Sequence, residues 1–458
     1  MAIINGGVEA LAGRVEGRVL RRGDEDFAAE VSGFQRAVTH HPEVVVGAAH
    51  ADDVRAAVAF AAEHGLPVAV QSSGHGVTVA LDGGVLITTG RMTGVEIDPD
   101  ARTARVEAGA RWADVTREAA PHGLMPPSGS APNVGVLGYT LGGGTPLLGR
   151  TIGYAADHVR ALDVVTADGT ARHVTADSDP DLFWALRGGR DNYGVVTALS
   201  IGLVPVRTLY AGGLYYDAAD AGVIFERYRT WSADLPDEVT TSIGMLAYPP
   251  VPALPEPLRG RHVVHVRFVS VGSSAAAEDL LEPLRALGPR LIDRVGEMPV
   301  TEAGSVYSEP DFPHGYYGGN VLLTGLDRDA LATVVAMTGP GGDVSGVVDL
   351  RQLGGAMARE PDVESAVPYR AAQYVFRVIG MVDDGADVAA VRDSHERVYA
   401  ALAPWTLGRS VNFLYGAAGP TEFVERIYPP EMLGRLARVK ATYDPRNLFR
   451  GTHNVLPA

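Results

Sequence analysis

The sequence predicts an α+β protein of two domains, the second of which carries an antiparallel sheet. The chain has 458 residues, which is too long for one ordinary core and suits two domains of ~200 residues. Short β-rich runs alternate with amphipathic helical segments in the first part of the chain, and longer strand-like runs follow. Glycine is concentrated between Ser72 and Gly194, whereas proline is more frequent after Pro205, so the composition changes near residues 203–206.

The first part, residues 1–205, predicts short strands separated by helices. The helix at 51–64 has Asp52 and Asp53 in its first turn, where the positive end of the helix dipole favours acidic side chains, and Gly65 ends it. Further helices are predicted at 112–122 and 179–186. The predicted strands cover 42–46, 67–71, 84–88, 95–98, 103–107, 159–166, 171–174 and 194–203, with Asp168-Gly169 as a hairpin turn.

The second part, residues 206–411, predicts an antiparallel sheet with helices on one face. Residues 261–269 alternate well enough for a half-buried strand. The other predicted strands are 345–353 and 373–382, and the predicted helices are 274–287 and 387–402. In the tail, residues 412–458, a helix is predicted at 429–443.

Composition excludes several classes of function. The formal net charge of −16 argues against nucleic acid or an anionic membrane as a partner, and through steering it mildly disfavours anionic substrates. The chain has no cysteine, which removes disulfides, thiolate nucleophiles and iron–sulfur clusters, and its single lysine, Lys440, argues against a Schiff base. No secretory signal and no membrane span are visible, so a soluble cytoplasmic protein is expected.

Several common motifs are missing. The sequence has no G-x-G-x-x-G, no G-x-x-x-x-G-K-[ST], no G-x-S-x-G and no H-E-x-x-H. A Rossmann dinucleotide turn, a P-loop and a nucleophile elbow are therefore not expected, and neither is a metal site.

Glycine-rich loops that follow predicted strands are the main candidates for a binding site. The loop at 71–76 (QSSGHG) would expose consecutive backbone N–H groups, as a pyrophosphate cradle does, but a tight turn with an incidental histidine fits equally well. The run at 126–144 removes side chains over a long path, and its interspersed apolar residues favour a buried path beside a flat ligand over a mobile loop. A third glycine, Gly194, stands at a strand start.

Four stretches together resemble a known family. They are VAVQSSGHG, GSAPNVGVLGYTLGGG, FWALRGGRDNYGVVT and YDPRNLFRGTHNV, in the family's order and at about its spacing. They resemble the flavoprotein oxidases of the vanillyl-alcohol-oxidase superfamily, which has a PCMH-type FAD-binding fold, and specifically its berberine-bridge-enzyme-like branch. The resemblance implies an FAD domain at 1–205 to which 412–458 returns, a substrate domain at 206–411, and FAD between them.

The resemblance also implies a set of FAD-contacting residues in these stretches and the segments beside them. Besides His75, they are Gln71, Ser72, Ser73, Gly74, Gly76, Val77, Gly129, Ala131, Val134, Gly135, Gly138, Tyr139, Gly142, Gly143, Gly144, Gly153, Asp157, Asn192, Gly194, Val195, Val196, Asn412 and Asn454.

His75 occupies the family position that bonds covalently to the flavin 8α-methyl carbon. Many members add a second bond through a cysteine, but here that position is Ala131, so a single covalent link is expected. Gln71 stands where the family usually has an arginine, which removes one charge partner of the pyrophosphate. Val134 matches a position that gates oxygen access, and valine there resembles the oxidase type.

A departure near the C-terminus concerns the catalytic base. Many relatives carry Y-x-N-Y on a strand facing the flavin, with the last tyrosine as base, but the run here is SVNF and ends in Phe413. Phenylalanine cannot take a proton, and relatives that oxidise amines also lack this tyrosine. The alternative bases are Tyr415, Tyr317, Tyr374 and Asp349, although each tyrosine could instead be an aromatic packed in a sheet or an interface.

The expected function is an FAD-dependent oxidase or dehydrogenase that tailors a small secondary metabolite. A C–H next to oxygen or nitrogen would give a hydride to flavin N5, and dioxygen would be reduced to hydrogen peroxide. The alternatives are a covalent flavoprotein that sequesters a toxic small molecule or drug without turnover, and an interaction protein that has lost its flavin. Residues 314–320 (HGYYGGN) and 349–352 are expected to line the substrate pocket, although the first could also be a turn.

Overall fold

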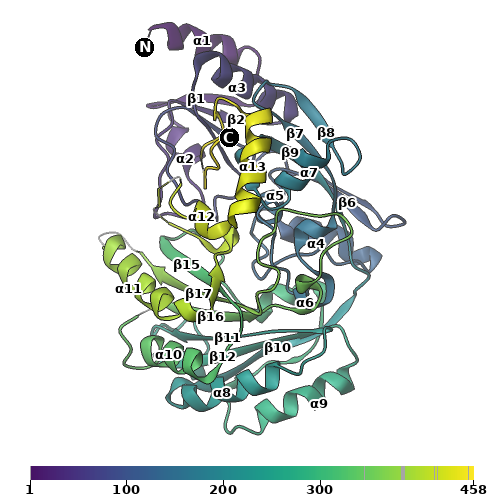
Figure 1. The fold of residues 1–458 in the computed structure, drawn as a ribbon, viewed down its shortest axis with the longest axis vertical. Helices are drawn as coiled ribbons and strands as arrows, with labels where there is room; N and C mark the ends of the chain where they lie inside the picture. The colour runs from purple at the N-terminus through teal and green to yellow at the C-terminus, as the bar shows by residue number, and fades with distance from the viewer. Residues whose placement is uncertain (1, 345, 383–386, 417, 420, 452) are drawn as a thin grey trace.

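The structure is a computed structural model that describes residues 2–344, 346–382, 387–416, 418–419, 421–451 and 453–458. Ser345, at the start of one predicted strand, and Thr452, within the tail motif, lie outside these residues. The molecule is elongated, with two smaller sheets toward one end and one large sheet toward the other (Figure 1). Among its described helices, none combines the length and the apolar character that a membrane crossing requires.

The first sheet has four strands in the order β1-β2-β4-β3, of which β2, β4 and β3 are parallel. Helix α3 connects β2 to β3, as a parallel pair requires, and Gly65 ends this helix in the left-handed conformation at φ +65°. Helix α1 packs against α3 at the outer end (Figure 1). The elements are α1 (Ala2–Ala12), β1 (Arg18–Arg21), α2 (Phe27–Val31), β2 (Val44–Gly47), α3 (Ala51–His64), β3 (Val68–Gln71) and β4 (Val85–Thr88).

The second sheet has five antiparallel strands in the order β5-β6-β9-β7-β8. Its core is built around Trp112, Phe183 and Leu199, together with Leu436 from the tail. The elements are β5 (Val95–Asp98), β6 (Thr103–Glu107), α4 (Trp112–Ala119), α5 (Val136–Leu141), α6 (Gly149–Ile152), β7 (Val159–Val165), β8 (Ala171–Val174), α7 (Pro180–Leu186) and β9 (Val195–Gly202).

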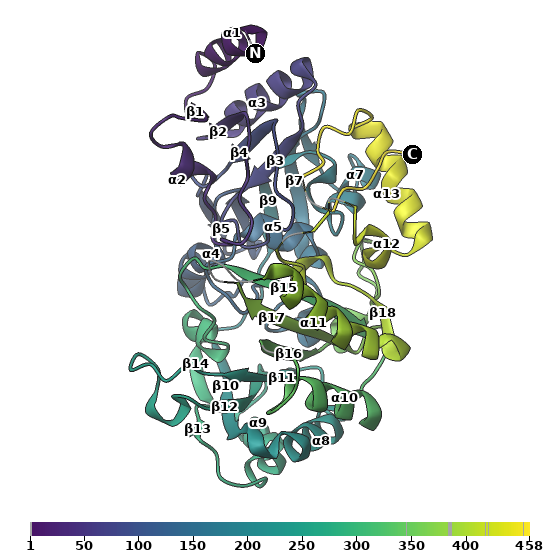
Figure 2. The same ribbon diagram turned by 90° about the vertical axis from the view of Figure 1, so that its left-hand side faces the viewer.

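The third sheet is antiparallel throughout and has nine strands in the order β13-β10-β12-β11-β16-β17-β15-β18, with β14 also paired to β10. Helices α8–α11 cover one face and share a core with it that includes Phe225, Phe268 and Phe376, so the predicted sheet with helices on one face is confirmed (Figures 1 and 2). The strands are β10 (Thr208–Asp217), β11 (Val239–Ala247), β12 (His262–Ser270), β13 (Ile292–Asp293), β14 (Gly296–Pro299), β15 (Tyr316–Leu323), β16 (Val347–Gln352), β17 (Tyr374–Met381) and β18 (Thr406–Gly408). The helices are α8 (Ala221–Ser232), α9 (Ser274–Arg285), α10 (Arg328–Thr338) and α11 (Val388–Ala401).

The structure corrects one expectation for this sheet and decides a second that the sequence left open. The strand expected at 261–269 is β12, but it is buried at every position after His262 rather than half-buried, because the face without helices packs against the first part of the chain. The tyrosine- and glycine-rich segment at 314–320, which was left open as a turn, begins β15. Both outcomes depend on what packs against the face of the sheet without helices, and the residue pattern of a single strand does not indicate that packing.

The tail returns to the two smaller sheets. Phe449 forms a β-bridge with Val68, and α13 (Pro430–Tyr443) lies beside α7, after the short α12 (Val424–Ile427) (Figure 2). The SVNF run forms a 3₁₀ turn over Val411–Phe413, whereas the resemblance implied a strand. This turn lies between the nine-stranded sheet and the Gly-rich run, because Asn412 contacts Tyr139.

Candidate functional site

The loop after β3 presents a row of free backbone donors. Gly74 has φ +72°, and a Cβ there would lie 2.5 Å from the Cα of Gly33, so only glycine fits this turn. Among the described residues, no protein group accepts a hydrogen bond from the backbone N–H groups of residues 72–76. A row of backbone donors without protein acceptors is suited to a phosphate or pyrophosphate.

His75 is held in place from three sides. Its ring stacks on Phe34 at 3.8 Å, its Nδ1 lies 2.9 Å from the Ser73 Oγ, and its carbonyl accepts a 2.6 Å hydrogen bond from the Tyr316 hydroxyl. Burial, assisted by the nearby Arg111, lowers the pKa of His75 to about 4. The imidazole is therefore neutral at physiological pH, and one ring nitrogen carries a free lone pair.

The long Gly-rich run lies directly beside this loop. The Gly135 N–H donates to the Ser73 Oγ at 3.2 Å, and a Cβ on Gly135 would lie 3.1 Å from the Ser72 Oγ. Further along the run, a Cβ on Gly142 would lie 1.9 Å from the Asn412 Oδ1. The absence of side chains therefore brings the two loops and the 3₁₀ turn into contact, which a larger residue would prevent.

The polar groups around these loops fit a dinucleotide. Several buried polar atoms have no partner within the described residues: the Ser72 Oγ, the Tyr139 hydroxyl, the Asn454 Oδ1 and both ring nitrogens of His453. Buried polar atoms are almost always paired, so a ligand that supplies their partners is expected here. Arg190 also contributes a cation, since its Nη2 lies 3.6 Å from where a Cβ on Gly76 would be, and it can replace the arginine missing at position 71.

The third predicted segment, residues 192–196, joins the region of the Gly-rich loops to the tail at 412–458. The Asn192 side chain donates to the carbonyls of Gly189 and His453 at 2.9 and 3.3 Å and accepts from the Val455 N–H at 2.9 Å. Val195 and Val196 are side chains of the hydrophobic cores. Other predicted cofactor residues also have structural partners, since Gln71 donates to the Val31 carbonyl at 3.0 Å and Asp157, beside Gly153, accepts from Arg370 at 2.6 Å.

Two of the predicted bases lie on the wrong face of the nine-stranded sheet. The Tyr317 ring packs 5.6 Å from His395 of α11, and the Tyr374 hydroxyl lies 3.2 Å from the Ser232 Oγ of α8. Because side chains alternate along a strand, it is Tyr316 that faces His75. We conclude that Tyr317 and Tyr374 cannot act as bases at this site.

Asp349 and Tyr415 both face the loops, but Asp349 is held by ion pairs. The Asp349 carboxylate accepts from Arg267, Arg351 and Arg377 at 3.0, 2.6 and 2.7 Å. Burial would raise the pKa of Asp349, but the arginines outweigh burial and hold the pKa well below its usual value. Its oxygens are thus saturated by guanidinium groups, which makes Asp349 a poor base.

Tyr415 is the predicted base that the structure leaves at the site. It forms a β-bridge with Gly318, and its ring lies 5.4 Å from that of Tyr316. Burial raises the pKa of its hydroxyl, while Arg377 partly opposes this increase.

Sequence reasoning missed Glu309 and Arg190, and it included Tyr316 only as one residue of the segment 314–320. Glu309 accepts from the Ser130 hydroxyl at 2.9 Å and from Arg351 and Arg377 at 3.3 and 3.2 Å. The alternation of β15 would have separated Tyr316 from Tyr317, but the alternation does not indicate which of them faces the loops. No local signal marks Glu309 or Arg190, which lie in connecting segments.

Two family models match the chain. The FAD binding domain model covers residues 42–175, which include His75 and the whole Gly-rich run at 126–144. The "Berberine and berberine like" model covers residues 406–456, which include the 3₁₀ turn, Tyr415 and the tail. The two matched regions contain the loop at 71–77, the Gly-rich run and the 3₁₀ turn, which the structure brings together.

Known proteins resemble the chain over nearly its whole length. An FAD-linked oxidoreductase of Dictyostelium discoideum is 27% identical over 452 residues, covering 97% of this chain and 95% of its own. The (R)-6-hydroxynicotine oxidase of Paenarthrobacter nicotinovorans is 26% identical over 475 residues and covers 97% of both chains. In structure, the chain is similar to xylooligosaccharide oxidase from Myceliophthora thermophila, with a TM-score of 0.86 at 21% identity over 99% of each chain, which shows a common fold.

Proposed function

We propose that the chain, which matches the FAD binding domain and the berberine-like family models, is an oxidase of a small secondary metabolite whose FAD is bonded covalently to His75 alone. Residues 1–205 and 412–458 hold the cofactor in this proposal, and residues 206–411 bind the substrate. When bound, FAD supplies a hydride acceptor at N5 for a C–H next to oxygen or nitrogen, and returns the electrons to dioxygen as hydrogen peroxide.

The environment of His75 is the observation that supports this proposal most directly. A partly buried, neutral imidazole, held by Phe34 and Ser73 beside a row of free N–H groups, is suited to bond formation at a carbon of a bound ligand. Ala131 offers no second attachment atom, and the chain contains no cysteine.

The other residues have distinct parts in the proposed reaction. The free N–H groups of residues 72–76, with Arg190, bind the pyrophosphate. Tyr415 takes or shares the substrate proton, and Arg377 favours the phenolate form that this requires. The Phe413 ring, 5.0 Å from the Arg377 guanidinium, fills the position of the family tyrosine and shields the site from water.

Acid precipitation tests the covalent link. The purified protein is expected to be yellow, and the yellow colour is expected to remain in the acid pellet of the wild type but to leave the pellet of the H75A variant. His314→Ala is the matched control, because His314 also packs against Phe34, but in an edge-to-face contact at 5.5 Å rather than in the stacked contact that His75 makes. A white wild-type pellet, or an equal loss of colour in both variants, would exclude His75 as the attachment site.

The pH dependence of flavin attachment gives an independent check. When apoprotein is reconstituted with FAD, the fraction of flavin kept in the acid pellet should stay constant above pH 6.5, the ordinary His value, and fall only near pH 4. The folded pKa is lowered, so the imidazole keeps its lone pair through this range and loses it only when protonated near pH 4. A midpoint close to pH 6.5 would contradict the buried, neutral state.

Peroxide release separates turnover from sequestration. We expect the yellow protein to release hydrogen peroxide with members of a panel of small alcohols, amines and hydroxy acids. A protein that binds members of this panel but releases no peroxide, and whose flavin is not bleached under anaerobic conditions, would instead be a binding protein.

A further inference from the structure

A cluster of charged side chains, all of them buried except the partly exposed Glu309, lies on the face of the nine-stranded sheet that is turned toward the Gly-rich loops. It consists of Arg267 of β12, Asp349 and Arg351 of β16, Arg377 of β17, and Glu309 from the segment before β15. Arg351 also donates to the Ser130 hydroxyl at 3.1 Å, which ties the cluster to the loop that carries Ala131. The cluster is therefore part of the proposed site and not of the core behind the sheet.

The cluster carries one positive charge more than its own carboxylates neutralise. Arg351 and Arg377 each contact both Asp349 and Glu309, whereas Arg267 reaches only Asp349. Burial disfavours the charged forms, but the neighbouring opposite charges prevail and hold the pKa of each carboxyl below its usual value. A buried charge without a partner is unfavourable, so an anion is expected to complete the cluster.

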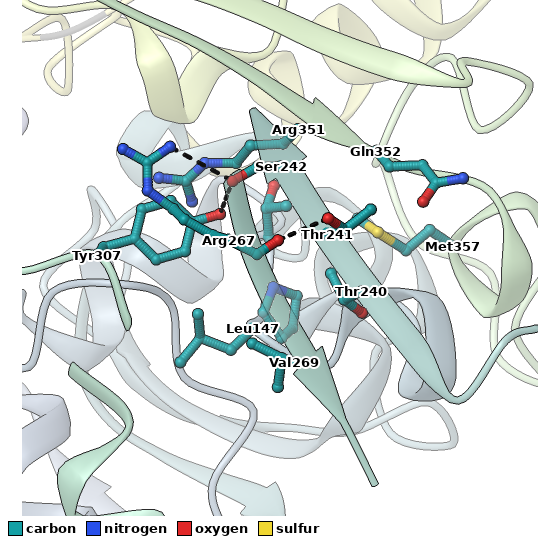
Figure 3. Close-up of a pocket in the computed structure, with 12 residues that line it drawn as sticks. Leu147, Thr240, Thr241, Ser242, Arg267, Val269, Tyr307, Arg351, Gln352 and Met357 are labelled. Atoms are coloured by element: carbon teal, nitrogen blue, oxygen red, sulfur yellow. Dashed lines mark hydrogen bonds between the residues drawn. The ribbon is translucent and has the colours of Figure 1, made fainter. Parts of the chain in front are cut away.

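The surplus cation borders a small pocket beneath the sheet's loop-facing side (Figure 3). Arg267 and Arg351 line it, with Tyr307 stacked 4.5 and 4.3 Å from their guanidinium carbons. Among the described residues, two buried atoms that belong to residues lining the pocket have no hydrogen-bond partner: the Nε of Arg267 and the Oε1 of Gln352. These unpartnered groups are a second sign, independent of the charge count, that the pocket is built for a polar ligand.

We propose that this pocket binds a carboxylate group of the substrate through Arg267, so that the substrate of the proposed oxidase is a small carboxylic acid. The proposal rests on the proposed function, because it assigns the substrate class of that same site. A carboxylate supplies one negative charge, which matches the single surplus cation, and its two oxygens suit a guanidinium. Leu147, Val269 and Met357 line the remainder of the pocket and suit the apolar part of such a molecule (Figure 3).

This local charge outweighs the acidity of the whole chain. The net charge of −16 acts at long range, where salt screens it beyond ~8 Å, whereas Arg267 acts at hydrogen-bonding distance within a desolvated pocket. The expectation from composition that anionic substrates are disfavoured therefore concerns the rate of encounter and does not determine which group is bound.

Binding of benzoate and of its neutral analogue benzamide to the flavin-containing protein tests the proposal, by titration calorimetry and by the perturbation of the flavin spectrum. Neither probe has an oxidisable C–H next to oxygen or nitrogen, so the readout is independent of turnover. Benzoate is expected to bind roughly 10- to 100-fold more tightly than benzamide, as a charge-assisted hydrogen bond would give. If the wild type binds benzoate and benzamide with equal affinity, the proposal is overturned without any need for a variant.

Variants assign the discrimination to Arg267. We expect R267Q to lose the preference for benzoate and R267K to retain part of it, while R328Q, at an arginine whose side chain is 80% exposed, should bind both probes as the wild type does. If R267Q shifts the flavin midpoint potential but leaves the benzoate affinity unchanged, the surplus positive charge acts on the flavin and not on a substrate carboxylate. A protein that binds benzoate through Arg267 but oxidises nothing would keep this inference and overturn the oxidase.

Discussion

Replacing Tyr415 with phenylalanine is expected to lower kcat roughly 100- to 10,000-fold, which is the usual contribution of a positioned proton acceptor. Of the four residues predicted as bases, Tyr317 and Tyr374 face the helices and Asp349 is saturated by arginines. Tyr415 remains, with its ring 5.4 Å from that of Tyr316, whose hydroxyl binds the His75 backbone. The measurement is the rate of flavin bleaching by substrate under anaerobic conditions, followed by stopped flow.

The pH profile identifies the cause of this loss. Burial raises the pKa of Tyr415 above its ordinary value, so the phenolate fraction, and with it kcat/KM, should rise steadily from neutral to alkaline pH in the wild type. In Y415F this rise should disappear. Tyr317→Phe is the matched control. Its kcat should stay within about twofold of the wild type, because Tyr317 packs against the helices, away from the reacting atoms, and takes no part in proton transfer. An unchanged kcat in Y415F, or equal losses in both variants, would exclude Tyr415 as the proton acceptor.

Local signals in the sequence were sufficient to locate many of the secondary-structure elements. The helix at 51–64 forms with the predicted bounds, because its acidic first turn and Gly65 act within one helical turn. The prediction at 112–122 holds as a helix followed by a 3₁₀ turn, which ends at Gly123 with φ +73°. These features act through residues that are close in the sequence, so they indicate the same helix ends whatever the rest of the chain packs against them.

The arrangement of the site depends on contacts between distant segments, which local patterns do not encode. The phase of β15, and hence the choice between Tyr316 and Tyr317, is set by pairing with β17 and by the helices behind it. The charge cluster combines residues between Arg267 and Arg377 that lie far apart in the sequence. Asp349 was predicted as a base, but the structure surrounds its carboxylate with three arginines, which make it a poor base. The glycine pattern located the Gly-rich loops and the family resemblance indicated the role of His75, but neither provided a means to identify these partners.

Replacing Lys440 with methionine is expected to lower the free energy of unfolding by about 3–5 kcal/mol, the usual cost of breaking a buried ion pair by removing one partner. The Lys440 Nζ donates to the Asp444 carboxylate at 2.7 Å and to the carbonyls of Asn192 and Phe449, both at 2.6 Å. Both members of the pair are fully buried. Urea denaturation followed by circular dichroism measures the loss, with Arg438→Met on the exposed side of the same helix as the control.

The same substitution should also weaken retention of FAD, because Lys440 links α13 to the turn at Asn192 and to the strand-like segment at Phe449 that borders the cradle. Asp444 holds that segment through the N–H groups of Leu448 and Phe449 at 2.7 and 2.8 Å, so an unpaired Asp444 would remain engaged but carry an uncompensated buried charge. Adding Asp444→Asn to K440M should therefore recover part of the lost stability. If the double variant is less stable than K440M by the full cost of a second independent loss, the two residues act through backbone contacts alone and the ion pair contributes nothing.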